Sequence, residues 1–358
     1  MATATVNREA FLRTLAQVEP GLSQRDIIEQ SACFILLEGY VWSYNDEIAC
    51  KCRSGLPPEF TGAVPHKPLL DQLQKWTDDE VTLTLGDGEL LIAGKRRKSG
   101  IRMEKDIALP LDAIERPKKA AWQPLHAEFA EAVGVVGQCA GRDESKFSST
   151  CVHVSPKWVE ACDDIQLCRW LLPTGFAGSV LMRQASVKHV QQLAMTEFAE
   201  TDNWVHFRNP ARLTLSCRRY LEEYPDLTKY LDRKGAPASL PKGLAEAADR
   251  AAVFTAEVPE GNYVNVRLGG GKVRVRGEGV AGWFEERRTV TYNGEPLEFY
   301  IAPSMLEQVV KRHNEVEVSA THMRVVSSKW TWYTALANPA TAAKNGDGNG
   351  KAEEEGGE

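Results

Sequence analysis

Cysteine and histidine are the residues of this sequence best suited to metal binding or nucleophilic chemistry. The chain has eight cysteines and seven histidines, yet it contains no C-x-x-C pair and no H-E-x-x-H segment, which are the spacings typical of redox and zinc sites. The cysteines (positions 33, 50, 52, 139, 151, 162, 168 and 217) mostly stand in apolar, strand-like stretches. We therefore expect small buried thiols in a reducing compartment, with disulfides as the alternative. We expect neither a metal nor a cofactor.

Two further segments have the composition of catalytic motifs. Asp163 and Asp164 are adjacent carboxylates, but neighbouring side chains of a strand point to opposite faces, so a turn is the better interpretation. Residues 268–275, "LGGGKVRV", place a lysine after glycines but lack the P-loop spacing and its Ser/Thr. The sequence therefore predicts no enzyme.

Composition is that of an ordinary globular chain. The formal net charge of -6 argues against a generally basic surface for gripping nucleic acid, although a local basic lining remains compatible with it. No run of eighteen apolar residues occurs and the first residues lack a signal pattern, so we expect a cytoplasmic protein without a membrane segment. Residues 338–358 are rich in Gly, Ala, Asn and Glu without an aromatic residue, which predicts a disordered acidic tail.

Helical periodicity recurs along the chain. Apolar residues follow helical spacing in six segments: 7–18, 66–76, 123–136, 186–195, 242–254 and 303–313. Asn7 and Ser186 are expected N-caps, and Pro68 and Pro124 are expected in first turns. A strand-like hairpin pattern follows each segment; its clearest cues are Gly86-Asp87-Gly88 and the glycines at 269–271. The regular spacing indicates an internal repeat.

The repeat predicts the domain organisation. A helix with a few strands has one apolar face that it cannot bury alone, so two such half-units are expected to make one domain. Charged, Pro-containing joints then divide the chain into domains 1–117, 118–232 and 233–337 of an α+β fold, followed by the tail. The octapeptide "YPDLTKYL", residues 224–231, is expected to be the last strand before the second joint.

Several segments, in this order, match one known family. They are "VNREAFLRTL" from Val6, "DESKF" from Asp143, "VEACDDIQL" from Val159, "EEYPDLTKYL" from Glu222, "LAEAADRAAVF" from Leu244 and "VTYNGEPLEFYIAPSMLEQVV" from Val290. The chain thus resembles the bacterial beta-type DNA sliding clamp, the DNA polymerase III beta subunit, over residues 4 to about 336. Nine tryptophans and diverged motifs favour a divergent or phage-borne member.

The resemblance implies three duplicated clamp domains in an arc, which closes as a head-to-tail homodimeric ring around double-stranded DNA without sequence readout. The helices would then carry a modest basic lining. Candidate DNA-facing residues on them are Arg8, Arg13, Lys67, Lys75, Lys188, Arg250, Lys311 and Arg312, with ordinary solvated charges as the alternative. Arg96 and Arg97 fit either a DNA-touching rim loop or an exposed turn. The third helix carries Glu128 and Glu131, so we expect it to contribute least.

The resemblance also implies a groove for short peptides of the DNA polymerase and the clamp loader. The residues that match its walls and floor, or complete it, are Asp164, Ile165, Gln166, Leu167, Pro225, Lys229, Tyr230, Trp332, Tyr333 and Leu336. Only Leu167 is retained from the family's Gly-His-Arg-Leu floor, and Trp332 and Tyr333 are larger than usual there. Packing of the domain joint is the alternative role. The sequence therefore predicts a processivity factor, with a clamp-fold scaffold that binds proteins without encircling DNA as the alternative function.

Overall fold

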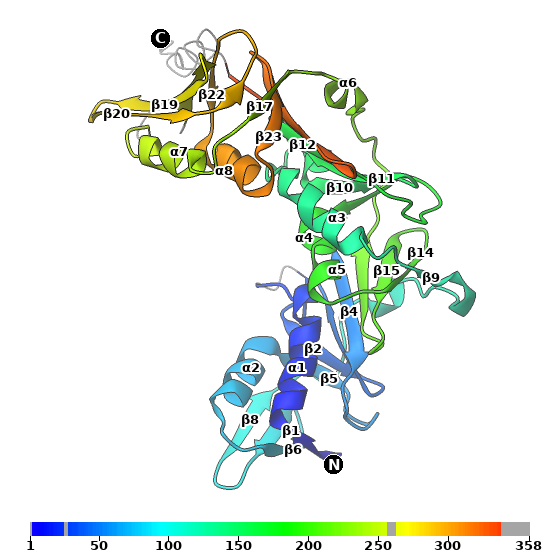
Figure 1. Cartoon of the computed structure of the whole chain (residues 1–358). Helices are drawn as coiled ribbons and strands as arrows, with labels where there is room; N and C mark the ends of the chain where they lie inside the picture. The colour runs from blue at the N-terminus through cyan, green and yellow to red at the C-terminus, as the bar shows by residue number, and fades with distance from the viewer. Residues whose placement is uncertain (1, 25–27, 256–262, 338–358) are drawn as a thin grey trace, which may run out of the picture. The chain divides into compact units, whose positions relative to one another are not determined.

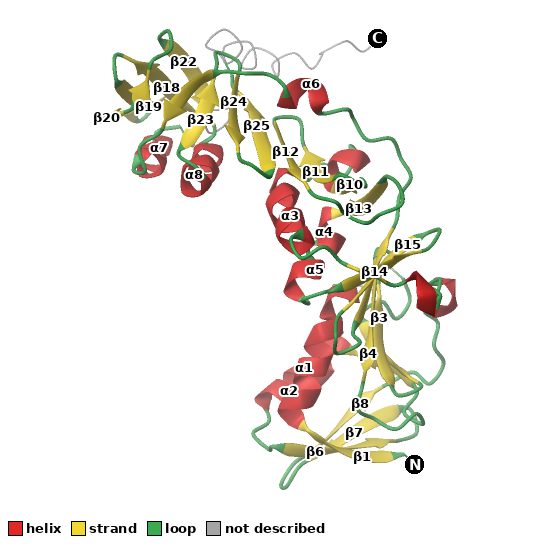
Figure 2. Ribbon diagram, turned by 45° about the vertical axis from the view of Figure 1, so that its right-hand side comes forward, coloured by secondary structure: helices red, strands yellow, loops and turns green. Residues whose placement is uncertain are grey.

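The structure is a computed structural model that describes residues 2–24, 28–255 and 263–337; the predicted tail lies outside them. By internal contacts the chain divides into two units. The first unit contains Met1–Ala161 and Leu171–Tyr224, and the second contains Cys162–Trp170 and everything from Pro225 onward. Both units mix helices with antiparallel sheets (Figures 1 and 2), which confirms the predicted α+β class. The three-domain division remains a prediction.

The first unit opens with a four-stranded sheet and two helices. The sheet has the order β1 (Thr3–Asn7), β6 (Glu80–Leu85), β7 (Glu89–Ala93), β8 (Lys98–Arg102). Helices α1 (Arg8–Val18) and α2 (His66–Lys75) lie side by side in Figure 2. Asn7 caps α1 as predicted, because its Oδ1 accepts a hydrogen bond from the Ala10 N–H at 2.9 Å. The apolar stripes of both helices are buried.

An eight-stranded sheet joins distant parts of the first unit. Its order is β5 (Gly62–Pro65), β2 (Cys33–Leu37), β3 (Tyr40–Tyr44), β4 (Ile48–Arg53), β16 (Thr214–Arg218), β15 (Trp204–Arg208), β14 (Glu197–Glu200), β9 (Gln123–Pro124). The central β4–β16 pairing runs antiparallel from Thr214↔Lys51 to Cys217↔Ile48. Backbone hydrogen bonds therefore hold the strands of residues 33–65 to those of residues 197–218.

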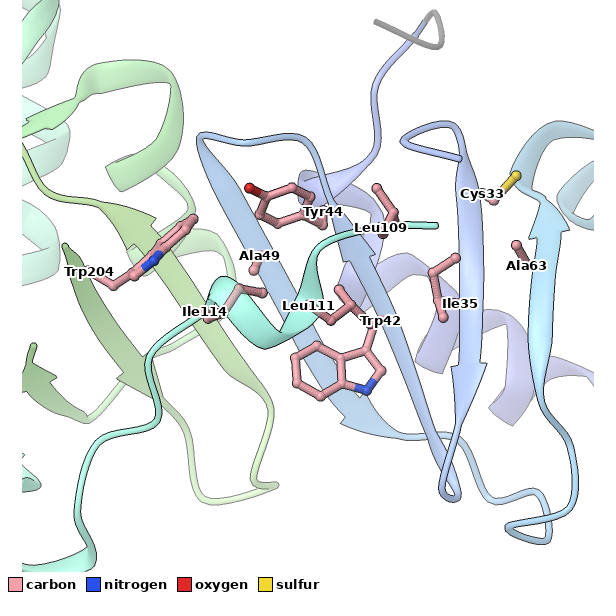
Figure 3. Packing of buried hydrophobic residues seen from close by; sticks show 10 residues of the cluster. All are labelled: Cys33, Ile35, Trp42, Tyr44, Ala49, Ala63, Leu109, Leu111, Ile114 and Trp204. Atoms are coloured by element: carbon pink, nitrogen blue, oxygen red, sulfur yellow. The ribbon is translucent and has the colours of Figure 1, made fainter. Parts of the chain in front are cut away.

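A buried apolar cluster reinforces this junction (Figure 3). Its members are Cys33, Ile35, Trp42, Tyr44, Ala49, Ala63, Leu109, Leu111, Ile114 and Trp204. Trp204 comes from β15 and is 1% exposed, and its ring lies 6.2 Å from that of Tyr44 on β3. The guanidinium of Arg218 covers the indole at 4.7 Å. One tryptophan thus contacts both halves of the sheet.

The rest of the first unit repeats the helix-plus-strands plan. It consists of α3 (Phe129–Val136), β10 (Cys151–Val154), β11 (Trp158–Cys162), β13 (Val180–Arg183), α4 (Gln184–Val187) and α5 (His189–Gln192). Strand β10 pairs antiparallel with both β11 and β13.

The second unit has two sheets and a pair of helices. The first sheet has the order β12 (Gln166–Leu171), β25 (Trp330–Ala335), β24 (His322–Val326), β23 (Glu315–Val318), β17 (Ala236–Ser239), β21 (Thr291–Tyr292). The second has the order β20 (Gly282–Thr289), β19 (Lys272–Gly279), β18 (Val264–Gly269), β22 (Leu297–Ile301). Helices α7 (Leu244–Ala252) and α8 (Pro303–Arg312) lie side by side against the sheets (Figure 1), and α6 (Thr228–Leu231) is a single turn.

The predicted glycine hairpin of this unit is confirmed. Gly269 pairs with Lys272, so the loop consists of Gly270 and Gly271 alone. Both have a positive φ, 58° and 70°, which is the left-handed region that a tight hairpin turn requires and that glycine reaches without strain.

Three predictions about local structure are wrong. The third helix begins at Phe129 instead of Gln123, because Gln123 and Pro124 form an edge strand on β14, where proline is tolerated. Ser186 is not an N-cap: the helical segment begins at Gln184, breaks at Lys188, and leaves Ser186 buried inside α4.

The octapeptide 224–231 is also not a strand. Asp226 accepts a hydrogen bond from the Thr228 N–H at 2.9 Å, which starts the short helix α6. Proline at 225 lacks the N–H that a ladder needs, and an aspartate two residues before an N–H favours such a turn.

All eight cysteines are free and buried, as predicted, and the disulfide alternative is wrong. Burial raises the pKa of Cys50 and of Cys52 to about 12 and that of Cys151 to about 11. These thiols therefore stay protonated near neutral pH. No helix in the described part of the chain is long and apolar enough to cross a membrane.

Trp204→Ala tests the role of the cluster. The substitution leaves a cavity between β15 and β3, so we expect a loss of about 3–5 kcal/mol in the free energy of unfolding, measured with denaturant. Trp204→Phe, which keeps much of the buried ring, should lose clearly less. Equal stability of the alanine variant and the parent would contradict the assigned role.

Candidate functional site

The predicted groove residues gather around one strand pair of the second unit. Strand β12 pairs antiparallel with β25, with Gln166 opposite Thr334, Leu167 opposite Tyr333 and Cys168 opposite Trp332. The Ala335 N–H donates to the Ile165 carbonyl at 2.7 Å, which extends the ladder by one bond. Segments about 165 residues apart in the sequence therefore form one continuous surface.

Strand alternation places these residues on two faces. Trp332 and Gln166 share the face toward α8, where the Trp332 Nε1–H donates to the Gln166 Oε1 at 3.4 Å. Thr334 lies on the same face, with its Oγ1 donating to the Met305 sulfur of α8 at 3.4 Å. Directly opposed residues of an antiparallel pair share a face, so Leu167 and Tyr333 lie on the other one. The structure thus places Gln166 and Trp332 on the face opposite to that of Leu167 and Tyr333.

Helix α6 covers the face of Leu167 and Tyr333. The ring of Tyr230 lies 5.9 Å from that of Tyr333. Arg169 of β12 donates to the Thr228 Oγ1 at 3.3 Å, and Arg324 of β24 donates to the Leu231 carbonyl at 2.5 Å. Two arginines from the sheet therefore hold the first and last residues of this single turn.

Tyr333 is the centre of a group of side chains that we call the outer-face cluster: Leu167, Tyr230, Arg233, His322 and Tyr333. The His322 ring stacks on Tyr333 with centroids 5.2 Å apart at 18°, and Arg233 donates to the Tyr333 hydroxyl at 3.4 Å. Leu167 and Tyr333 are each only 5% exposed. The cluster is filled by the chain's own side chains.

The other predicted groove residues flank the cluster. Ile165 is 38% exposed, Asp164, Pro225 and Lys229 are exposed as well, and Leu336 is buried. The Lys229 ammonium lies 4.9 Å above the Tyr230 ring. An apolar centre with exposed polar and apolar neighbours suits a small binding site.

Sequence reasoning missed the residues that hold the cluster together: His322, Arg233, Arg169 and Arg324. Strand alternation in 330–335 could have shown that Trp332 and Tyr333 face opposite ways. Nothing in the sequence pointed to His322 or Arg324, because their partners come from β25 and from α6.

The surroundings of His322 lower its pKa. Burial lowers its pKa below the ordinary 6.5, and the positive charges of Arg233 and Arg324 lower the pKa further. Nδ1 lies 2.7 Å from the Ser319 Oγ, whereas Nε2 is buried without a hydrogen-bond partner in the described structure. The ring that stacks on Tyr333 is therefore neutral at pH 7.

Three DNA-facing candidates have partners within the protein. Arg8 is 13% exposed and donates to the carbonyls of Asp78 at 2.9 Å and Leu73 at 3.1 Å, next to the C-terminal end of α2. Arg250 bonds the Glu286 carboxylate at 2.6 and 3.0 Å, and Lys311 pairs with Glu307 one turn earlier on α8. These three cations therefore already form hydrogen bonds or ion pairs within the protein.

The other DNA-facing candidates are solvent-exposed. Arg13 lies on α1, Lys67 and Lys75 on α2, and Lys188 between α4 and α5. Arg96 and Arg97 lie in the loop between β7 and β8, where the Arg97 Nε approaches the Asp78 carboxylate at 3.5 Å. The Arg312 side chain falls outside the described part of the structure. On the third helix, Glu131 is exposed.

The remaining carboxylate motif has a structural explanation. The Asp163 carboxylate accepts from the backbone N–H groups of Ile165 and Gln166 at 2.8 and 2.7 Å, which makes a turn, as predicted. Among the described residues, no group of three His, Cys, Asp or Glu side chains is placed to hold a metal ion.

This arrangement of duplicated helix-plus-strand units is the fold of a DNA sliding clamp, which confirms the resemblance seen in the sequence at the level of the fold. The chain is similar to the DNA polymerase III beta chain of Streptococcus pneumoniae, with a TM-score of 0.82 and 15% identity over 94% of this chain and 100% of that one. It is also similar to the DNA polymerase III beta subunit of Thermotoga maritima (TM-score 0.80, 16% identity, 94% and 100% covered) and to the Pseudomonas aeruginosa sliding clamp (TM-score 0.79, 16% identity, the same coverage). No protein-family model and no curated protein matches the sequence.

His322 makes the stability of the second unit pH-dependent. The pKa of His322 in the folded state is below 6.5, so at mildly acidic pH the unfolded chain binds a proton more readily than the folded chain does. The contribution of His322 to the free energy of unfolding is therefore fully present above pH 6.5. It is lost as the pH falls from 6.5 toward the folded-state pKa. We expect His322→Gln to lose less stability than the parent between pH 7.5 and 5.5, measured by denaturant unfolding. An identical pH dependence in the two proteins would show that His322 titrates freely.

Proposed function

We propose that this chain is a divergent DNA sliding clamp: a cytoplasmic, non-catalytic processivity factor that encircles duplex DNA as a head-to-tail homodimer and tethers a replicative polymerase. One observation carries the proposal. The fold matches sliding clamps from several bacteria over 94% of this chain and over 100% of theirs. At about 15% identity this likeness is one of fold, and the residue-level argument comes from the chain itself.

Several helices expose cations, which a DNA lining would need. Each phosphate that a protein neutralises releases counterions and strengthens binding, so a clamp needs few direct contacts. Arg13, Lys67, Lys75 and Lys188 are exposed on or beside helices of the first unit. In the second unit, Arg250 and Lys311 are already paired with glutamates, which weakens their pull on phosphate. From this distribution we expect a modest lining without base readout.

In the proposed ring, two copies of the chain join through edge strands. Strand β8 ends the four-stranded sheet of the first unit, and β20 ends the four-stranded sheet of the second. Beside β20 the chain exposes apolar side chains: Trp283 is 59% exposed and Val253, just past α7, is 72% exposed. Pairing of β8 in one copy with β20 in the other would satisfy both edges and cover this apolar surface, and the contact closes after two copies.

The outer-face cluster is the proposed docking site for short peptides of the polymerase and of the clamp loader. Tyr230 is half-buried and belongs to a single helical turn, whereas Leu167 and Tyr333 beneath it are buried in the sheet. We expect a peptide to pack against the exposed side of Tyr230, with the Leu167–Tyr333 pair as the floor beneath that ring. Aromatic side chains commonly dominate such sites.

The alternative, a clamp-fold scaffold that does not encircle DNA, has a specific observation in its favour. Arg8, Arg250 and Lys311 are bonded within the protein, and α3 exposes Glu131 where a DNA lining would be basic. The oligomeric state and DNA retention distinguish the two functions.

A ring has a defined mass and a topological hold on DNA. We expect light scattering to give twice the chain's 39.7 kDa, and loaded protein to stay on circular DNA but leave linearised DNA. Trp283→Asp with Val253→Asp should give monomers that circular DNA no longer retains, because both charges enter the joint. A stable parental monomer, or equal loss from both DNA forms, would favour the scaffold.

Tyr230→Ala tests the docking site. Loss of an anchoring tyrosine typically costs about 2 kcal/mol, so we expect about 30-fold weaker binding of the cognate polymerase, measured by surface plasmon resonance. Trp330→Ala, on the opposite face of the same sheet, is the matched control and should bind normally. Equal weakening by both variants would point to a general defect instead of a docking site.

A further inference from the structure

The face of the β20-β19-β18-β22 sheet that points away from α7 and α8 carries more cations than carboxylates. Antiparallel register aligns Arg267, Arg274 and Arg287 across β18, β19 and β20. The alternate residues, such as Val266 and Val275, are buried toward the helices. Three arginines thus stand in one row on the outer face.

The row lines a hollow of about 310 Å³. Its lining residues are Arg267, Gly269, Gly270, Lys272, Arg274, Arg287 and Pro296. Four of these seven are cations and none is a carboxylate. The two-glycine turn has no side chains to fill the space beside them, so the hollow stays open.

Carboxylates neighbouring the hollow neutralise only part of this charge. Arg274 approaches Glu298 at 3.4 Å and Glu285 at 3.7 Å, and Arg287 pairs with Glu285 at 2.8 Å. Arg276 and Glu278 complete this face of the sheet. It therefore carries five cations (Arg267, Lys272, Arg274, Arg276 and Arg287) and three carboxylates (Glu278, Glu285 and Glu298). Within the described residues, Arg267 and Lys272 have no ion pair, and the buried Arg274 Nε has no hydrogen-bond partner. This arrangement suits further carboxylates.

An acidic segment of the sequence follows directly after a residue that pairs with the edge of this sheet. Ala337, the last described residue, pairs with Tyr300 of the edge strand β22 through hydrogen bonds of 2.8 and 3.2 Å. The following residues 338–358 contain five acidic residues and two lysines, and their last seven include four glutamates and no cation. Opposite charges thus lie on one sheet and on the segment that leaves it.

We propose that Glu353, Glu354 and Glu355 bind the hollow lined by Arg267, Lys272, Arg274 and Arg287 of the same chain. Glu353 follows Ala337 by sixteen residues, and a random-coil linker of that length spans about 22 Å on average. The cations of the hollow stand on β18, β19 and β20, which lie two to four strand spacings, or about 10–20 Å, from Ala337. A linker whose average span matches the distance gives the highest effective concentration.

The contact would shield the outer face from nucleic acid. A cationic surface attracts phosphates regardless of topology, and that attraction weakens with salt. Partly exposed ion pairs are individually weak, so docking would be reversible and salt-sensitive. The inference holds whether or not the chain encircles DNA, since it concerns only the face opposite the helices.

Zero-length cross-linking of the full chain tests the contact. A carbodiimide joins a carboxylate to a lysine amine as an amide, and mass spectrometry identifies the pair. We expect Lys272 to be joined to the 352–358 peptide at low salt, and Arg267→Glu to reduce that yield about fivefold. Lys242→Glu, the same charge change at an exposed lysine outside the hollow, should leave the yield unchanged.

Mixing isotopically heavy and light protein identifies the occupant. In a 1:1 mixture that has exchanged subunits, links found almost only within one isotopic form support the proposal, whereas mixed heavy–light links making up about half of the total would assign the hollow to a second copy's tail and overturn it. Absence of the Lys272 link, or equal yield in the Arg267→Glu variant, would overturn it as well.

Oligonucleotide binding tests whether the acidic residues shield the basic hollow from nucleic acid. The triple variant Glu353→Gln, Glu354→Gln, Glu355→Gln should bind a single-stranded oligonucleotide about fivefold more tightly than the parent at low salt, and the gain should vanish when Arg267→Glu is added. Unchanged affinity of the triple variant would refute the shielding role.

Discussion

The antiparallel pairing of β12 with β25 is the interaction on which the candidate binding surface depends. It joins residues 166–170 to residues 330–334, and only this register brings Leu167 opposite Tyr333. A shift by one residue would turn every side chain of β25 to the other face, with Trp332 under α6 and Tyr333 against α8. The pairing of β4 with β16 likewise joins distant segments in the first unit, where Trp204 of β15 packs against Tyr44 of β3.

Local signals explain what could be predicted from the sequence. Asn7 before an apolar helical stripe predicts a cap, and the glycines at 269–271 predict a hairpin, because both features depend on residues a few positions apart. Pro124 and Ser186 misled the prediction, since pairing with β14 and burial within α4 outweighed their usual positional preferences. The clamp-like order of the segments was visible, and strand alternation also held the opposite facing of Trp332 and Tyr333, whereas the partners that α6 and α8 supply to the two faces were not visible.

Some roles could not be predicted from the sequence because they depend on polar contacts between residues far apart in the chain. Arg8 has the type and position of a DNA contact, yet its hydrogen bonds go to carbonyls 65 and 70 residues away. Likewise, Arg324 holds α6 through a carbonyl 93 residues away. A guanidinium has five donors and can complete a helix end as readily as it binds phosphate. Its role is therefore set by tertiary structure.

The buried thiols have a practical consequence. All eight cysteines are buried, and burial holds the pKa of Cys50, Cys52 and Cys151 well above neutrality, so the thiolate that alkylating reagents need is scarce. A single cysteine introduced at an exposed position can therefore carry a fluorophore without removal of the native ones. A variant with one such added cysteine is thus suited to single-molecule tracking.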